Sequence, residues 1–250
     1  VHSHNLDKLM KRIEELEKNI VSLQFPIIIK PVDLTGGKGI QRADSIEEAK
    51  NAFSIAMKKT RENYCIAEEF IEGSRHGFSC YICKERVVFY FADNEQYFLN
   101  PYLVSGANTP SSSSRTTLEM LKKYSERIAK KLHLVDGILH IQYIEKDNGI
   151  PFIIEVCRRS PGDLYIKLVQ YATGINYSKF IVMAETGMDV SAILDTPTQG
   201  FWLRHCIMAN RTGIIQQVSF AKEIQDKVIE KFLWYKPGEN VLDLLHYKAG

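Results

Sequence analysis

The sequence predicts an α+β protein, in which helices and pairs of antiparallel strands alternate without a regular order. Two segments have the pattern of a β-hairpin: residues 78–93, with a turn near Lys84-Glu85, and residues 137–156, with the turn Asp147-Asn148-Gly149. Amphipathic helical patterns stand before, between and after these hairpins. The composition, 45% hydrophobic and 25% charged, is ordinary for a globular protein, and 250 residues allow one large domain or two lobes.

The first quarter of the chain predicts two helices and two strands. Apolar residues recur at steps of three and four from Leu6 to Leu23, which predicts one amphipathic helix. This helix either lies on its own domain or forms a seam for another helix or subunit. Residues 26–32 predict the first strand, and Ser45 with Glu48 forms a capping box before the second helix. Residues 64–70 predict the second strand.

The remaining elements follow from the same patterns. The further predicted strands are residues 78–82, 86–93, 137–144, 150–156, 201–209 and 213–219. One further predicted helix runs from Leu118 to Leu132. Three more cover residues 164–173, 178–185 and 222–230. Between them, residues 100–117 are polar and rich in serine. A connection of this length predicts a mobile or substrate-facing loop.

Charge and hydropathy exclude several classes of protein. A net charge of +2 argues against a general nucleic-acid binder. No run approaches the roughly 18 apolar residues of a membrane helix, and no signal peptide is visible, so we expect a cytoplasmic protein that does not bind membranes. The five cysteines, an odd number, favour a reducing compartment.

Cys80 and Cys83 have the C-x-x-C spacing of many metal and redox sites. The residues around them have the pattern of a strand, in which positions three apart face opposite sides. We therefore interpret them as two separately packed thiols, with a zinc or redox role as the alternative.

The segment from Ile28 to Gly39 carries the pattern of a phosphate site. Ile28, Lys30 and Val32 share one face of a strand, where a lysine is costly unless its ammonium meets an anion or reaches water. The loop Gly36-Gly37-Lys38-Gly39 offers backbone amides and a second cation, and could close over phosphates as a lid. It lacks the Walker A spacing. The alternatives are a lysine that reaches solvent and a plain hairpin turn.

Two further groups of polar residues complete the pattern. Glu68 and Glu69 end a strand just before a turn, where backbone groups and a carboxylate can meet an adenine edge; solvated acids are the alternative. Glu155 ends another strand and is a hard oxygen donor suited to Mg²⁺, to which Gln142 could add a carbonyl oxygen. Arg159 could stabilise charge on a transferring phosphoryl group, or Arg and Glu could form a structural pair.

These motifs, in this order, resemble the ATP-grasp superfamily of carboxylate–amine ligases, and within it the branch of biotin carboxylase, carbamoyl-phosphate synthase and L-amino-acid ligases. The resemblance covers roughly residues 25–190. It implies two lobes of antiparallel sheet with helices that clasp a nucleotide. The implied divisions are an N-terminal helix (1–24), a first lobe (25–75), a second lobe (76–194) and a small C-terminal lobe (195–250). It also implies that an N-terminal domain of complete members is absent from this chain.

The implied activity uses ATP and Mg²⁺, or Mn²⁺, to turn a carboxylate into an acyl phosphate that an amine or a thiol attacks. The substrates would be small-molecule carboxylates and amines, and the partners a second copy or a separate N-terminal domain or subunit. The implied catalytic residues are Arg159 and Lys38. The implied nucleotide-binding residues are Lys30, Gly36, Gly37, Lys38, Gly39, Glu68, Glu69, Phe70, Ile71 and His76. The implied metal ligands are Glu155, Gln142 and Cys157, and residues 100–115 would help to shape the substrate pocket.

The sequence departs from the family pattern at three of these positions. Family members usually have a glutamate where Gln142 stands and an asparagine where Cys157 stands, and a thiol suits Mg²⁺ poorly. A ribose-binding glutamate is usual after Gly73, and His76 is the nearest substitute. These departures leave two alternatives to a ligase: a non-catalytic nucleotide-binding module with a regulatory or structural role, and a biotin-carboxylase-like carboxylase.

Overall fold

The computed structural model describes residues 23–193 and 196–250. The predicted N-terminal helix of residues 1–24 therefore falls almost wholly outside the described residues. The chain divides into two compact units. One runs up to Ile71 and includes Asn100–Leu103, and the other comprises Glu72–Leu99 and Val104–Gly250.

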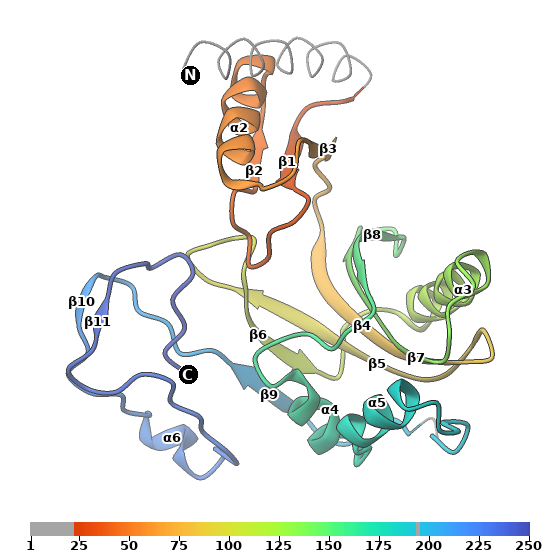
Figure 1. The fold of residues 1–250 in the computed structure, drawn as a ribbon. Coiled ribbons are helices and arrows are strands. Elements are labelled where there is room, and N and C mark those ends of the chain that lie inside the picture. Colours follow the sequence, from red (N-terminus) through yellow and green to blue (C-terminus); the bar gives the residue numbers. More distant parts are fainter. Residues whose placement is uncertain (1–22, 194–195) are drawn as a thin grey trace. The chain divides into compact units, whose positions relative to one another are not determined.

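The first unit is a small antiparallel sheet with one helix packed on it (Figure 1). Its strands, in the order β2-β1-β3, are β1 (Ile27–Pro31), β2 (Gln41–Ala43) and β3 (Cys65–Glu69). Helix α2 (Ile46–Lys59) begins at Ser45, whose Oγ accepts a hydrogen bond from Glu48 N at 3.3 Å. This contact confirms the predicted start of the helix. Ile27 and Ile29 of β1 pack against the apolar face of α2, which buries one side of the sheet.

The second unit contains a six-stranded antiparallel sheet in the order β8-β7-β4-β5-β6-β9. Its strands are β4 (Ser74–Cys83), β5 (Arg86–Tyr97), β6 (Val104–Thr109), β7 (Gly137–Glu145), β8 (Pro151–Cys157) and β9 (Trp202–His205). Its long helices are α3 (Arg115–Lys131), α4 (Tyr165–Thr173) and α5 (Tyr177–Glu185). Helices α4 and α5 cover one face of the sheet and α3 covers the other (Figure 1). Helices and antiparallel strands in this mixture confirm the predicted α+β class.

Each face of the six-stranded sheet has its own core. Cys80 belongs to the cluster under α3, whereas Cys83 belongs to the cluster under α4 and α5. Both thiols are buried, and all five cysteines are free. The interpretation of Cys80 and Cys83 as separately packed thiols is thus confirmed, because three residues along a strand bring a side chain to the opposite face.

The structure differs from the predicted elements in the region after β5. Residues 100–117 do not form one loop, because β6 lies within them and pairs with β5 and β9. Ser105 and Gly106 have weak strand propensity, but pairing on both sides outweighs it. In the last fifty residues, β10 (Gly213–Ile214), β11 (Asn240–Val241) and α6 (Lys222–Gln225) are short. The strand β10 and the helix α6 are shorter than the patterns of residues 213–219 and 222–230 predict, and the sequence predicts no strand at β11.

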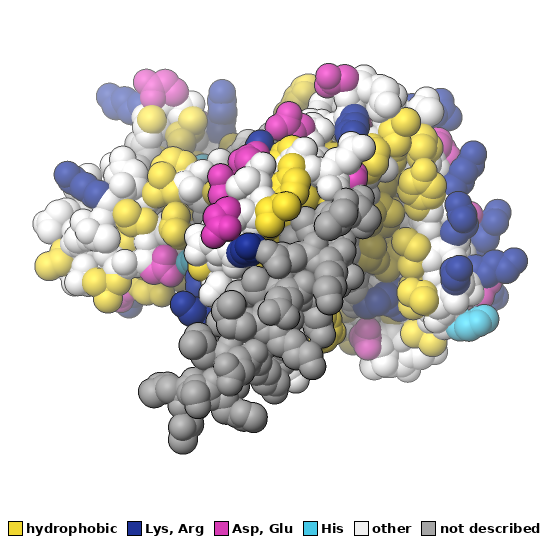
Figure 2. Space-filling model, turned by 90° about the horizontal axis from the view of Figure 1, so that it is seen from above, with side chains coloured by type: hydrophobic (Ala, Val, Ile, Leu, Met, Phe, Trp, Pro, Cys, Tyr) yellow, Lys and Arg dark blue, Asp and Glu magenta, His cyan; other side chains and the backbone are white. Residues whose placement is uncertain are grey.

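The surface carries both signs of charge. Figure 2 shows basic and acidic side chains interspersed over the visible face, which agrees with the net charge of +2. Across residues 23–193 and 196–250, no helix has both the length and the apolar character needed to span a bilayer.

Candidate functional site

Lys30 lies on the face of β1 that α2 does not cover. Burial alternates along this strand, with Ile27 and Ile29 fully buried and Lys30 partly exposed. The Lys30 ammonium forms an ion pair with the Glu68 carboxylate of β3, and their side chains are 20% and 46% exposed. The sequence pattern predicts an anion at this ammonium. In this structure that anion is Glu68, itself one of the predicted nucleotide-binding residues.

The glycine-rich loop follows β1 directly. Gly36, Gly37 and Gly39 all have positive φ, between 69° and 78°, which side-chain-bearing residues adopt only with strain. A Cβ atom added at Gly37 would lie 2.8 Å from the backbone oxygen of Tyr102. Asn100 Nδ2 also donates to Gly36 O at 3.5 Å. The loop is therefore seated on the segment Asn100–Leu103, a contact that no local sequence pattern indicates, and Lys38 at its tip is exposed.

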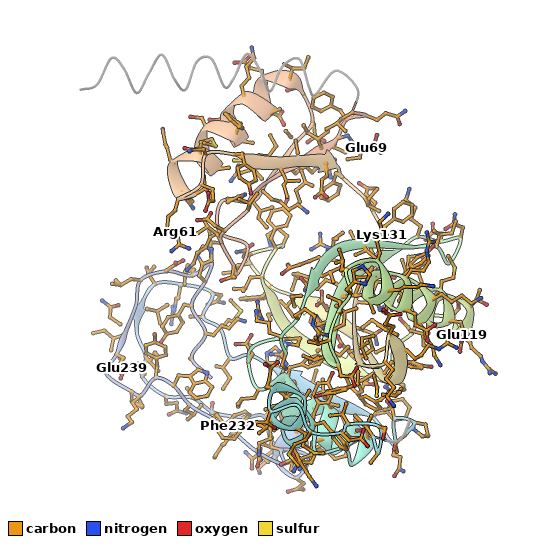
Figure 3. All side chains as sticks on the ribbon, turned by 45° about the vertical axis from the view of Figure 1, so that its right-hand side comes forward. Arg61, Glu69, Glu119, Lys131, Phe232 and Glu239 are labelled. Atoms are coloured by element: carbon orange, nitrogen blue, oxygen red, sulfur yellow. The ribbon has the colours of Figure 1, made fainter. Side chains whose placement is uncertain are left out.

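The predicted adenine hinge follows β3. Phe70 N donates to Pro26 O at 2.8 Å, and the Arg42 guanidinium lies 4.7 Å from the centre of the Phe70 ring. Glu69 is exposed, and its Oε1 accepts from Gln24 N at 3.2 Å. Figure 3 shows Glu69 at the end of the small sheet. The hinge backbone is thus fixed to the start of β1, while the Glu69 side chain remains on the surface.

Asp33 links the end of β1 to the end of α2. Its carboxylate accepts hydrogen bonds from Thr60 Oγ1 at 2.5 Å and from Arg61 N and Nε, both at 3.0 Å. These contacts, first of all the one from Thr60, lower the pKa of Asp33 from 3.8 to about 2. Arg61, labelled in Figure 3, lies just before β3. Asp33 therefore anchors the base of the glycine-rich loop, a role that no sequence motif indicates.

The three predicted metal ligands all lie on β7 and β8. Gln142 and Glu155 are direct register partners, and Cys157 is two residues further along β8. A β-bulge interrupts the pairing next to Gln142, as is common beside functional sites. The Glu155 carboxylate is exposed. Burial raises the pKa of the Cys157 thiol, whose Sγ donates to Arg159 O at 3.6 Å. Cys157 is thus a protonated thiol, the weakest donor of the three.

Arg158 and Arg159 look alike in the sequence but have different environments. The Arg158 guanidinium donates to the carbonyl oxygens of Ile138 at 2.6 Å, of Val135 at 2.8 Å and of Asp136 at 3.3 Å. It therefore ties the strand β7 to the end of β8. Arg159 is exposed, and its guanidinium donates to the neighbouring Ser160 O at 3.1 Å. Of the two, Arg159 is the one that can reach a substrate.

His76 lies on the other face of the sheet from Gln142. Its ring is 1% exposed and stacks on Tyr143, with the ring centres 5.2 Å apart. His76 Nε2 is 2.7 Å from Ser74 Oγ, and burial lowers the pKa of the imidazole. The structure thus does not bring His76 together with the predicted metal ligands, and ribose binding by His76 stays a prediction.

Beside Gln142 lies a group of buried and partly buried polar residues that the sequence motifs do not reveal. Tyr165 OH donates to Asp93 Oδ2 at 2.5 Å, and burial raises the pKa of Asp93 to about 7. Two residues along β5, Glu95 accepts from Gln142 Nε2 and from Tyr97 OH, each at 2.6 Å. Burial also raises the pKa of Glu95. In the sequence these acids look like the polar end of a hairpin strand, and only the register of β5, β4 and β7 brings them to Gln142.

The oxygen donors on β7 and β8 fit a magnesium ion held partly by phosphate. Within the described ranges, no three His, Cys, Asp or Glu side chains are grouped so that they could hold a metal by themselves. Mg²⁺ commonly takes one or two carboxylates, with water and substrate phosphates as the other ligands. Glu155 and the amide oxygen of Gln142 meet this need, whereas the Cys157 thiol does not.

Comparison with known proteins identifies the family. Residues 23–167, more than half of the chain, match the ATP-grasp domain. The chain therefore belongs to the ATP-grasp domain family, as the resemblance implied. The carbamoyl phosphate synthase large chain of Agathobacter rectalis is 25% identical over 180 residues, which are 69% of this chain and 16% of that protein.

Solved structures agree with this assignment. Phosphoribosylglycinamide synthetase from Anaerococcus prevotii is 26% identical, with a TM-score of 0.63 over 92% of this chain and 58% of that one. The biotin carboxylase domain of 2-oxoglutarate carboxylase from Hydrogenobacter thermophilus, solved with MgADP and bicarbonate, has a TM-score of 0.72 at 16% identity. It shares the fold over 95% of this chain and 54% of its own. The chain spans little more than half of these solved chains and a sixth of the curated relative.

Proposed function

We propose that the chain is the nucleotide-binding part of an ATP- and Mg²⁺-dependent ligase that joins a carboxylate to an amine or a thiol. The observation that carries the proposal is Lys30 on β1, followed at once by a loop with three left-handed glycines, in a chain of the ATP-grasp domain family. ATP would supply the phosphoryl group that converts the carboxylate into an acyl phosphate. The nucleophile then displaces phosphate and forms the new bond.

The first unit would hold the nucleotide. Lys30 would leave Glu68 and pair with a phosphate, since a charge-assisted bond to phosphate is stronger than a half-exposed ion pair. The backbone amides of Gly36, Gly37 and Gly39, with the Lys38 ammonium, would close over the phosphates. The backbone of Glu69, Phe70 and Ile71 would meet the adenine edge, with Glu68 or Glu69 near the exocyclic amine.

The second unit would hold the metal and the reacting carboxylate. Glu155 and the Gln142 amide oxygen would bind Mg²⁺, with Cys157 as a weaker neighbour. The exposed Arg159 guanidinium would orient the substrate carboxylate and stabilise the charge that develops on the acyl phosphate. Lys38 would serve the same purpose at the phosphoryl group. Lobe boundaries near residues 75 and 195 belong to this proposal.

A second candidate function is a nucleotide-binding module that does not catalyse. The amide at Gln142 and the protonated thiol at Cys157 favour it, because they leave Glu155 as the single carboxylate among the predicted metal ligands. A carboxylase that uses bicarbonate and biotin is a third candidate, and the biotin carboxylase neighbour supports it only through its fold. For all three we propose a cytoplasmic protein that acts with a second copy or with an N-terminal domain or subunit.

ADP release in the presence of a panel of carboxylates and amines separates these candidates. A ligase releases ADP only when a matching acid and nucleophile are both present, and a carboxylase requires bicarbonate. Arg159→Ala should lower the ligase rate by about a hundredfold, the scale for losing one donor to a developing oxyanion. Arg127→Ala, an exposed arginine of α3, is the matched control and should leave the rate unchanged. If the chain binds the nucleotide but forms no ADP from ATP with any combination of carboxylate and amine, the result would favour the non-catalytic module.

A further inference from the structure

The side chains of Glu95 and Gln142 meet although their strands are not neighbours. Glu95 is on β5 and Gln142 is on β7, with β4 between them. Gln142 Nε2 nevertheless donates to Glu95 Oε1 at 2.6 Å. Gly77 of β4 is the register partner of Gln142 on one side and of Asp93 on the other, and a Cβ atom there would lie 2.8 Å from the Asp93 carboxylate. Glu95 lies two residues beyond Asp93 on β5, so its contact with Gln142 runs diagonally across β4.

The contacts of Glu95 determine the orientation of the Gln142 amide. Both carboxylate oxygens of Glu95 accept hydrogen bonds, Oε1 from Gln142 and Oε2 from Tyr97 OH at 2.6 Å. Both oxygens of the Glu95 carboxyl group thus act as acceptors, and the end of the Gln142 amide that faces them is its donor, Nε2. The other end, Oε1, is then the end of Gln142 that a cation can use. Glu155, the register partner of Gln142 on β8, supplies the adjoining carboxylate.

We propose that Glu95 is a positioning residue of the metal site: it holds the Gln142 amide so that Oε1, beside Glu155, is presented to Mg²⁺. This inference rests on the proposed function, because it assumes a metal between Gln142, Glu155 and nucleotide phosphates.

The role of Glu95 reverses the simplest expectation for Gln142→Glu. Restoring the usual glutamate adds a charged ligand to the metal site, but here it also places two carboxylates at the present hydrogen-bond distance of 2.6 Å. Like charges so close cannot both ionise, so the pair must hold a proton or move apart. The swap Glu95→Gln with Gln142→Glu removes this conflict, since the amide introduced on β5 can donate to the carboxylate introduced on β7.

The test combines the two single variants with the swap, and measures two quantities. The first is the Tm of each ligand-free protein. The second is ADP affinity by calorimetry with and without Mg²⁺, the ratio of the two affinities being the magnesium effect. Glu95→Gln keeps a hydrogen bond to Gln142 but no longer fixes the direction of its amide. It should therefore lower the magnesium effect by about tenfold, the scale of one bond to a charged group, and leave ADP affinity without Mg²⁺ unchanged.

The swap should restore the magnesium effect to the wild-type value or above. Gln142→Glu alone should lower the Tm, and the swap should recover it. Gln170→Glu, at an exposed position of α4, adds the same charge elsewhere and should change neither quantity. An undiminished magnesium effect in Glu95→Gln would overturn the positioning role. The hydrogen bond between Glu95 and Gln142 would then only link β5 to β7. If the wild-type chain binds no ADP, the result would contradict the proposed function and this inference together. The Tm values of the variants would still show whether the side chains at positions 95 and 142 interact.

Discussion

The two units hold their predicted site residues in different ways. In the first unit, Lys30 and the loop Gly36–Gly39 lie within ten residues of chain, and Glu68 comes from the strand paired with β1. In the second unit, Glu95, Gln142 and Glu155 come from β5, β7 and β8, and β4 separates the first two. A site made from one short segment depends mainly on local conformation. A site made from several strands depends on the register of the whole sheet.

This difference has an energetic consequence. The Lys30 ammonium and the tip of the glycine loop reach the surface, so their substitution should change binding more than folding. Asp93 and Tyr165 lie inside the second unit, where each polar group depends on its partner, so their substitution should change stability as well. Substitutions in the two units therefore test this difference.

The largest effect on stability is expected at Gly73, the first glycine after the hinge. Its φ is +156°, and a Cβ atom there would lie 2.3 Å from Glu145 O. Gly73→Ala should therefore lower the free energy of unfolding by about 3 kcal/mol, because backbone must move to relieve the contact. Urea unfolding measures this value. Gly162→Ala is the control, since its Cβ would meet nothing within 4 Å; an equal loss in both variants would contradict the steric explanation.

Lys30→Ala should weaken Mg·ATP binding by roughly 1.5 to 3 kcal/mol, the usual contribution of a charge-assisted bond. Its effect on the free energy of unfolding should stay below about 1 kcal/mol, because its partner Glu68 is half exposed and returns to water. Calorimetry and urea unfolding measure the two quantities. Lys58→Ala, in the exposed last turn of α2, is the matched control. Unchanged affinity in Lys30→Ala would remove Lys30 from the site.

Asp93→Asn should change how stability depends on pH. The pKa of Asp93 is raised from 3.8 to about 7 by burial, so between these values the folded protein holds a proton that the unfolded chain releases. This group therefore makes the protein less stable as the pH rises from about 4 to about 7. The free energy of unfolding of the variant, relative to that of the wild type, should therefore rise by at least about 1 kcal/mol from pH 5 to pH 8, as measured by urea unfolding. Parallel pH profiles would show that Asp93 does not titrate in this range.

His140 should give the opposite slope on the same sheet face. Burial, with the charge of Arg159, lowers its pKa from 6.5 to about 3, and Nδ1 is 2.7 Å from Ser79 Oγ. The folded protein therefore keeps His140 neutral where the unfolded chain takes up a proton, and stability falls as the pH drops below about 6.5. His140→Gln should flatten the acid side of the wild-type profile in urea unfolding and leave the side above pH 7 as it is. An acid side as steep as that of the wild type would contradict this assignment.

The smallest effect is expected at Asp33 in the first unit. Thr60→Val keeps the side-chain shape but removes the hydrogen bond that contributes most to the low pKa of Asp33. The pKa of Asp33, measured by NMR titration of the carboxyl carbon, should rise from about 2 toward 3.8. Because the folded pKa is depressed, the stabilisation is present above pH 3.8 and is lost as the pH falls toward 2. A titration that does not move would assign the low pKa to Arg61 alone.

The contrast between the units also explains what the sequence could predict. Three predictions depend on near neighbours, and the structure confirms them. They are the shared strand face of Ile28 and Lys30, the capping residue Ser45, and the opposite faces of Cys80 and Cys83. The contact of Glu95 with Gln142 depends on a register across three strands, which no local period contains.

Two other differences have the same origin. The strand β6 has small and polar residues, and pairing with β5 and β9 makes it a strand. The structural role of Arg158, which donates to the carbonyl groups of residues 135, 136 and 138, is not indicated by the sequence. In each case a long-range contact decides the structure, and a pattern of neighbouring residues does not contain that information.

The proposed function requires that the chain bind ATP together with Mg²⁺ in spite of Gln142 and Cys157. Calorimetric titration of the chain with ATP, in the presence and absence of Mg²⁺, measures this binding. We expect binding that becomes tighter when Mg²⁺ is added, because Glu155 and the Gln142 amide oxygen then share the ion with the phosphates. A folded protein that binds no ATP under either condition would contradict the claim.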